Sequence, residues 1–249
     1  MQYTTYNIID FPSGEVEVKL NIVNNIIYCR LYKDLNKSLM AAVIAIYKLK
    51  AIYNNIIAII PFLPYSRSEI ESIISIFRLS GVSKIVTIEI HSENVQEQIV
   101  DNISIIPEII TKIGIDLKEL VIVAPDKGGY NRVKNAAEVL NCQFTWMSKT
   151  RKNNSIQHIL HNKNIVHNRS VIIVDDIVDT GATINSAGDI LYSYGAKSIK
   201  ALAIHGVLSK SEFSNKIEKI YITNTIEQGV ISEKIEVITI EKYLNILNF

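Results

Sequence analysis

Apolar residues along the chain form short continuous runs, separated by segments with helical spacing. The runs are apolar almost throughout, which is typical of strands buried on both faces of a sheet. They are residues 56–62, 84–91, 119–126, 170–176 and 198–205. The helical segments are residues 36–52, 68–81, 131–141 and 183–195. Strands that alternate with helices in this way predict an α/β protein whose parallel sheets are covered by helices.

The elements fall into two groups along the chain, which predicts two domains. Residues 101–119 interrupt the alternation with a proline and one short amphipathic stretch, a pattern typical of a linker that contains a helix. We therefore place the boundary near Ile105. The sequence predicts an N-terminal domain over residues 1–104 and a C-terminal domain over residues 105–249, each a mostly parallel sheet flanked by helices.

Composition indicates a compact globular protein, with 48% hydrophobic and 20% charged residues in a chain of 249. The net charge of +1 gives no overall field that would gather nucleic acid or membrane lipid. The two cysteines, Cys29 and Cys142, stand far apart without metal-type spacing, and the N-terminus has no signal-peptide pattern. These observations predict a cytoplasmic protein with neither a nucleic-acid nor a membrane partner.

The densest polar signal lies in the sequence VIIVDDIVDTGATI, from Val171 to Ile184. Asp175 and Asp176 are adjacent although their carboxylates repel each other, which indicates a ligand that is cationic or rich in hydroxyls. Backbone N–H groups and hydroxyls at a strand-to-helix turn predict a phosphate site beside them. The residues of this candidate site are Asp175, Asp176, Asp179, Thr180, Gly181, Ala182 and Thr183. The alternative is a capped strand-to-helix turn with solvated acids.

The same motif resembles the phosphoribosyl diphosphate (PRPP) signature of type I phosphoribosyltransferases and of the ribose-phosphate diphosphokinases, or PRPP synthetases. Further segments are similar to the second family and follow its order along the chain. They are FPSGEVEVKL, PFLPYSRSE, TIEIHSENVQEQI, VAPDKGGYNR and WMSKTRKNN. The resemblance covers nearly the whole chain and implies a fold of two phosphoribosyltransferase-like domains.

The resemblance also implies site residues. They are Phe11, Ser13, Glu15, Arg67, Ser68 and His91 for ATP, His91 and Asp126 for Mg²⁺, and Lys149 and Arg151 for catalysis on a mobile loop. For ribose 5-phosphate they are Asp175, Asp176, Asp179, Thr180, Gly181, Ala182 and Thr183. The segment around Asp126 further supplies Gly128, Gly129 and Arg132. Each has a plainer alternative: a hydrogen-bonded histidine, an ordinary turn or a solvated basic loop. An adenine loop shared across a subunit interface implies a homo-oligomer, at least a dimer.

In the implied reaction, the C1 hydroxyl of ribose 5-phosphate attacks the β-phosphorus of ATP and gives PRPP and AMP for nucleotide biosynthesis. One alternative is a phosphoribosyltransferase that consumes PRPP, which would have no use for the ATP residues. Another is a non-catalytic regulatory subunit, which would lack the lysine or the acid pair. The sequence begins almost at the adenine loop, so we expect a trimmed N-terminal domain. Ser13 and Ser68 depart from the family pattern, and we expect altered ATP contacts there.

Overall fold

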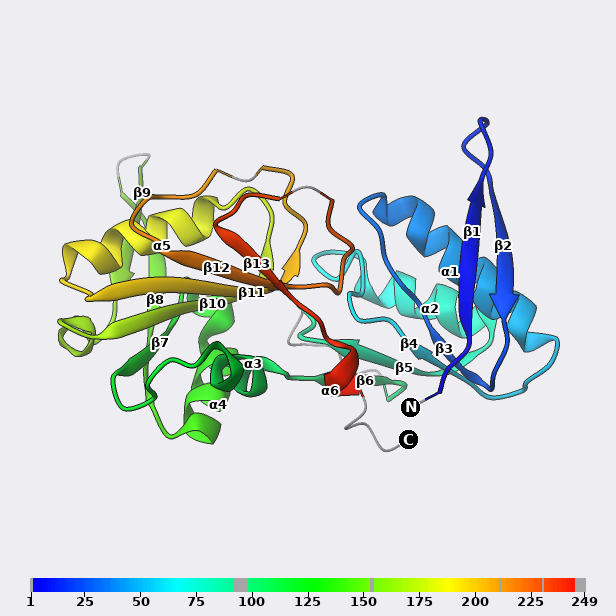
Figure 1. Ribbon diagram of the computed structural model, residues 1–249, viewed down its shortest axis with the longest axis horizontal. Coiled ribbons are helices and arrows are strands. Elements are labelled where there is room, and N and C mark those ends of the chain that lie inside the picture. Colours follow the sequence, from blue (N-terminus) through cyan, green and yellow to red (C-terminus); the bar gives the residue numbers. More distant parts are fainter. Residues whose placement is uncertain (1, 92–97, 153–154, 211, 230, 245–249) are drawn as a thin grey trace. The chain divides into compact units, whose positions relative to one another are not determined.

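The computed structural model describes residues 2–91, 98–152, 155–210, 212–229 and 231–244, with the backbone alone for strand residues from 149 to 157 (Figure 1). The chain divides into two compact units. The first unit contains Met1–Ser104, Thr225–Gln228 and Ile240–Phe249, and the second contains Ile105–Asn224 and Gly229–Thr239. The pattern of apolar runs did not show that two short segments near the C-terminus belong to the first unit. Among the described residues, no helix is long and apolar enough to cross a membrane.

The first unit combines an antiparallel hairpin with a parallel sheet. The hairpin consists of β1 (Thr5–Asp10) and β2 (Val16–Asn21), and the sheet has the order β3 (Ile26–Tyr28), β4 (Ile56–Ile59), β5 (Val82–Ile88) and β6 (Val100–Ile103). The helices are α1 (Leu35–Lys50), α2 (Ile70–Ser80) and the short α6 (Glu241–Leu244). Asp34 caps α1 by accepting the N–H of Lys37 at 3.0 Å. The buried face of α1 packs against β2, β4 and α2.

The second unit is a larger mixed sheet with helices on both faces. Its strands are β7 (Leu120–Ala124), β8 (Gln143–Lys152), β9 (Ser155–Leu160), β10 (Ser170–Val178), β11 (Ser198–Gly206), β12 (Lys219–Thr223) and β13 (Ile235–Ile238). They lie in the order β13-β12-β11-β10-β7-β8-β9, and all neighbours are parallel except β8 and β9. The helices are α3 (Ile106–Ile113), α4 (Tyr130–Leu140) and α5 (Ala182–Ser193), with short 3-10 turns η1 (Lys127–Gly129) and η2 (Lys163–Val166). Helix α5 covers one face of the sheet and α4 the other (Figure 1).

The strand order of the second unit reverses between β7 and β10. From β7 the chain builds outward through β8 and β9, then returns to the opposite side of β7 and continues through β11 to β13. Crevices at such reversal points, outside the carboxyl ends of the strands, are where open α/β sheets bind ligands. The β7–β10 pairing ends at Val123 and Ile173, whereas β10 stays paired with β11 as far as Val178. The last part of β10 therefore extends past β7, and it carries the acid pair.

Candidate active site

Asp175 and Asp176 lie within β10, three and two residues before its last residue, because β11 continues to pair with this part of the strand. The sequence predicted a strand over residues 170–176 with the acids at its end, whereas β10 continues to Val178. The N–H of Asp176 donates to Asp175 Oδ1 at 3.0 Å. The local hydrogen bond fixes the first carboxyl group beside the end of β7.

Arg132, in the first turn of α4, forms an ion pair with the second acid. Its Nη1 lies 3.5 Å from Asp176 Oδ1, and the two side chains are 9% and 5% exposed. A buried pair of this kind is strongly destabilised when one partner is removed, because the other charge is left uncompensated. The sequence marked Arg132 as part of a motif but gave no role for it. The structure assigns it to neutralising Asp176.

The pKa of Asp175 lies well above its usual range. Burial is the main cause, followed by the charge of Asp176 and a hydrogen bond between the two side chains. Arg132 opposes the shift and Asp126 adds to it. Asp175 is thus influenced by two further carboxyl groups and one guanidinium at the reversal point of the sheet. Such a surplus of buried negative charge is typical of a site that receives a cation or hydroxyl donors.

The loop from Asp179 to Gly181 connects β10 to α5 and opens onto the helix N-terminus. Gly181 has φ +78°, a conformation that favours glycine, and it precedes the first helical residue, Ala182. Among the described residues no side chain caps α5, whose N-cap residue is Gly181, and Thr180 Oγ1 accepts the N–H of Ala182 at 3.4 Å. Uncapped N–H groups and the positive end of the helix dipole favour an anion here. The segment predicted to bind phosphate therefore has a suitable backbone.

Asp126 follows β7 and caps the turn that leads into α4. Its Oδ1 accepts the N–H of Gly128 at 3.0 Å, which holds the carboxyl group at the end of the strand. Gly129 is buried, and a Cβ atom at this position would lie only 3.2 Å from the Cβ of Ala124. The glycine lets the turn pack closely on the strand, so that α4 starts where Arg132 can reach Asp176.

Lys149 and Arg151 lie on an antiparallel hairpin made by β8 and β9, at the place where the family resemblance implied a mobile catalytic loop. Their backbones pair with His158 and Ile156. The pairing depends on β9, a segment that local composition did not identify as a strand. At the root of the hairpin, the rings of Trp146 and His161 stack with centroids 3.7 Å apart.

The first unit holds the residues predicted to bind ATP. Arg67 and Ser68 are exposed in the loop between β4 and α2, and His91 is exposed shortly after β5. Because β4 and β5 are parallel neighbours, these segments leave the same edge of the sheet. Glu89, at the same edge, is buried with φ +43°.

Phe11, Ser13 and Glu15 form the tip of the β1–β2 hairpin, which projects away from the sheet of the first unit (Figure 1). The Ser13 hydroxyl donates to Glu15 Oε2 at 2.9 Å, and the side chain of Phe11 is 47% exposed. The sequence predicted a functional loop here without predicting that it would be a hairpin tip. An exposed aromatic ring beside a carboxylate suits stacking and hydrogen bonding to a planar ligand.

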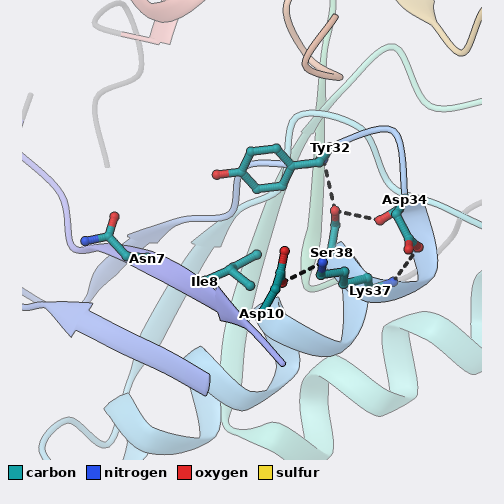
Figure 2. A pocket seen from close by; sticks show the side chains of 7 residues that line it. All are labelled: Asn7, Ile8, Asp10, Tyr32, Asp34, Lys37 and Ser38. Carbon is teal, nitrogen blue, oxygen red and sulfur yellow. Dashed lines mark hydrogen bonds and ion pairs between the residues drawn. The ribbon is translucent and has the colours of Figure 1, made fainter. Parts of the chain in front are cut away.

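A polar pocket of about 360 Å³ lies between β1 and the start of α1, next to this tip. Figure 2 shows the lining residues Asn7, Ile8, Asp10, Tyr32, Asp34, Lys37 and Ser38. Lys37 Nζ lies 2.5 Å from Asp10 Oδ1, and the Ser38 hydroxyl donates to the carbonyl of Asp34 at 2.8 Å. These internal bonds satisfy much of the lining, so we assign no ligand to this pocket.

The predicted Mg²⁺ ligands belong to different units, with His91 in the first and Asp126 in the second. Within the part of the chain that the structure describes, no three His, Cys, Asp or Glu side chains gather closely enough to hold a metal ion by themselves. Mg²⁺ takes few protein ligands and prefers oxygen, and the carboxyl surplus around Asp126 and Asp175 fits that chemistry. The His91–Asp126 pair stays a prediction.

Comparison with known proteins agrees with this geometry. A family model described as the phosphoribosyl transferase domain matches residues 91–236. A ribose-phosphate pyrophosphokinase of Thermotoga maritima is 28% identical over 92% of this chain and 81% of its own length. Ribose-phosphate pyrophosphokinase 2 of Archaeoglobus fulgidus is 31% identical over 87% and 83%. The crystal structure of the phosphoribosylpyrophosphate synthetase from Mycobacterium smegmatis superposes with a TM-score of 0.81 and 25% identity, covering 97% of this chain and 88% of that one.

Proposed function

The chain belongs to the ribose-phosphate pyrophosphokinase family, and from this membership we propose that it transfers the diphosphate of ATP to the C1 hydroxyl of ribose 5-phosphate. The bond between that oxygen and the β-phosphorus forms as the bond to the α-phosphate oxygen breaks, and PRPP and AMP are the products. The observation that carries the proposal is the acid pair at the reversal point of the sheet, followed by an uncapped helix N-terminus.

The second unit supplies the ribose 5-phosphate site. Backbone N–H groups of residues 179–183 bind the 5-phosphate, since they lie at the positive end of α5, where Gly181 provides no capping side chain. Asp175 accepts hydrogen bonds from the ribose hydroxyls, and Asp176 holds Arg132 while it supports the neighbouring acid. Fixing the ribose in this way brings its C1 hydroxyl to the attack position, which is the main contribution of positioning to such transfers.

ATP binds to residues of the first unit. Phe11, Ser13 and Glu15 contact the adenine, and their place at a projecting hairpin tip supports a site that a second copy of the chain completes. Arg67, Ser68 and His91 contact the phosphates. A homo-oligomer, at least a dimer, and a cytoplasmic location accompany this proposal as predictions.

Lys149 and Arg151 are the catalytic residues of the proposal, because charge accumulates on the β-phosphoryl oxygens during the transfer. Two cations on a hairpin offset that charge. Mg²⁺ held by Asp126 and His91 would supply further neutralisation at the ATP phosphates. The stacked rings of Trp146 and His161 hold the root of the hairpin, so the backbone before Lys149 starts from a fixed point.

The decisive experiment incubates the purified protein with ATP, Mg²⁺ and ribose 5-phosphate and measures both AMP and PRPP. Production of the two in equal amounts supports the proposal. Binding of both substrates without turnover would instead favour a non-catalytic subunit. Consumption of PRPP with a free base, and no AMP from ATP, would favour a phosphoribosyltransferase.

A further inference from the structure

Residues 207–210 and 212–214, which follow β11, lie against the phosphate loop of residues 179–183 and are called the bracing segment. We propose that this bracing segment positions the phosphate loop, with Phe213 as the positioning residue that makes the affinity for ribose 5-phosphate high. The inference rests on the proposed function, because it concerns the same phosphate site. Within the segment, residue 211 lies outside the part of the chain that the structure describes.

The first half of the bracing segment is bonded to the end of β10. The N–H groups of Val207 and Leu208 both donate to the carbonyl of Val178, at 2.9 and 3.2 Å. The N–H of Ser209 donates to Asp179 Oδ1 at 3.3 Å, and the N–H of Lys210 lies 3.5 Å from the Asp179 carbonyl. The side chain and the main chain of Asp179 therefore both hold the bracing segment at the start of the phosphate loop.

The second half is bonded to the first turn of α5, on the other side of the phosphate loop. Asn185 Nδ2 donates to the carbonyl of Glu212 at 2.9 Å, and Asn185 Oδ1 accepts the N–H of Ser214 at 2.8 Å. The Ser214 hydroxyl donates to Asp189 Oδ1 at 2.9 Å. The oxygen and the nitrogen of the Asn185 amide thus both bond to the bracing segment. The bracing segment is therefore attached on both sides of the phosphate loop, at Asp179 and at Asn185.

Between these attachments, the ring of Phe213 lies in the space that a side chain at Gly181 would occupy. A Cβ atom at Gly181 would lie 2.8 Å from Phe213 Cε1 and 3.3 Å from the carbonyl oxygen of Glu212. Phe213 also packs against the main core of the second unit, to which the buried Leu208 belongs. Glycine has the largest conformational freedom of any residue, so a partly buried ring that packs against both the core and Gly181 restricts the loop at its most flexible residue type.

This restriction matters because backbone N–H groups bind phosphate only when several of them point to one place. A displacement of about 1 Å in such a site can lower the rate about 10²-fold, and preordering a loop strengthens binding by removing the entropy lost on binding. The residues predicted to bind ATP belong to the first unit, whereas the bracing segment and the phosphate loop belong to the second. We therefore expect the effect to be selective for ribose 5-phosphate.

The test replaces the ring and compares both substrates. Phe213→Ala should raise KM for ribose 5-phosphate about 10-fold or more, while kcat and KM for ATP change by less than about threefold. Phe213→Leu should recover part of the loss, because it restores apolar contact with Gly181. Tyr192→Ala is the matched control: it removes an aromatic side chain, 57% exposed, from α5, the helix that follows the phosphate loop, and should change neither KM.

Calorimetric titration with ribose 5-phosphate separates this inference from the proposed function. If wild type binds ribose 5-phosphate but shows no turnover, the proposed function fails, and weaker binding by Phe213→Ala still supports the positioning role. Equal binding by folded Phe213→Ala and wild type overturns the inference, as does a parallel loss for both substrates.

Should Phe213→Ala not fold, Asn185→Ala tests the same point: a selective loss of ribose 5-phosphate binding supports the inference, and unchanged binding overturns it. Absence of any wild-type binding refutes both.

Discussion

Replacing Asp175 with Asn tests whether the acid pair lowers the stability of the protein while it serves activity. Asn has the same shape, keeps the Oδ1 that accepts the N–H of Asp176, and can still donate to the Asp176 carboxyl. Asn therefore mimics the protonated form of Asp175, and the substitution removes only the negative charge of the carboxylate. We expect Asp175→Asn to be more stable than wild type at neutral pH and much less active.

The expected pH dependence follows from the raised pKa of Asp175. An unfolded aspartate releases its proton near pH 3.9, whereas the native state keeps it to a higher pH. Between those two values the native state binds more protons, so wild-type stability falls as pH rises, by up to about 1.4 kcal/mol per pH unit. Asp175→Asn lacks this proton, and its advantage over wild type should grow from pH 4 upward until the native pKa of Asp175 is passed.

The assay is urea denaturation of both proteins at several pH values from about 4 to 8, with steady-state kinetics at neutral pH. Asp116→Asn is the control, since Asp116 is exposed in the same unit and its Oδ1 accepts the N–H of Lys118 at 3.0 Å. Its stability should stay within about 0.5 kcal/mol of wild type throughout.

Loss of a charged hydrogen bond, about 1.5–3 kcal/mol, should raise KM for ribose 5-phosphate about 10- to 100-fold in Asp175→Asn. Parallel stability curves, or a variant less stable than wild type at pH 8, would refute the reasoning.

Three further outcomes are expected. Lys149→Ala should lower kcat about 10²–10³-fold in the AMP assay with little change in KM for ribose 5-phosphate; an equal loss from Lys152→Ala would show that the catalytic lysine is misassigned. Arg132→Met should lower the free energy of unfolding by about 3–5 kcal/mol in urea, because the buried Asp176 loses its partner; a loss under about 1 kcal/mol would contradict the ion pair. Removing Mg²⁺ with a chelator should stop AMP release and adding it back should restore it; turnover that persists in chelator would contradict the metal requirement.

Much of the fold and of the chemistry was predictable from local sequence. Helix-flanked, mostly parallel sheets were predicted from apolar runs and helical spacing, and the resemblance of the ordered motifs to ribose-phosphate diphosphokinases is confirmed by relatives that match over most of the chain. The turn at Gly181 was predictable for the same reason, because its backbone conformation favours glycine whatever surrounds it. These features depend on neighbours a few positions away, which a single sequence displays directly.

Only the tertiary structure decided how the candidate site is held together. The extension of β10 past β7, the ion pair of Arg132 with Asp176, and the contact of Phe213 with Gly181 all join residues more than 30 positions apart. The β8–β9 hairpin likewise depends on long-range structure, because local sequence did not identify its second strand, β9, as a strand. Local sequence shows which residue types could bind phosphate and ribose. The distances between those residues follow from strand order and register, which long-range packing determines.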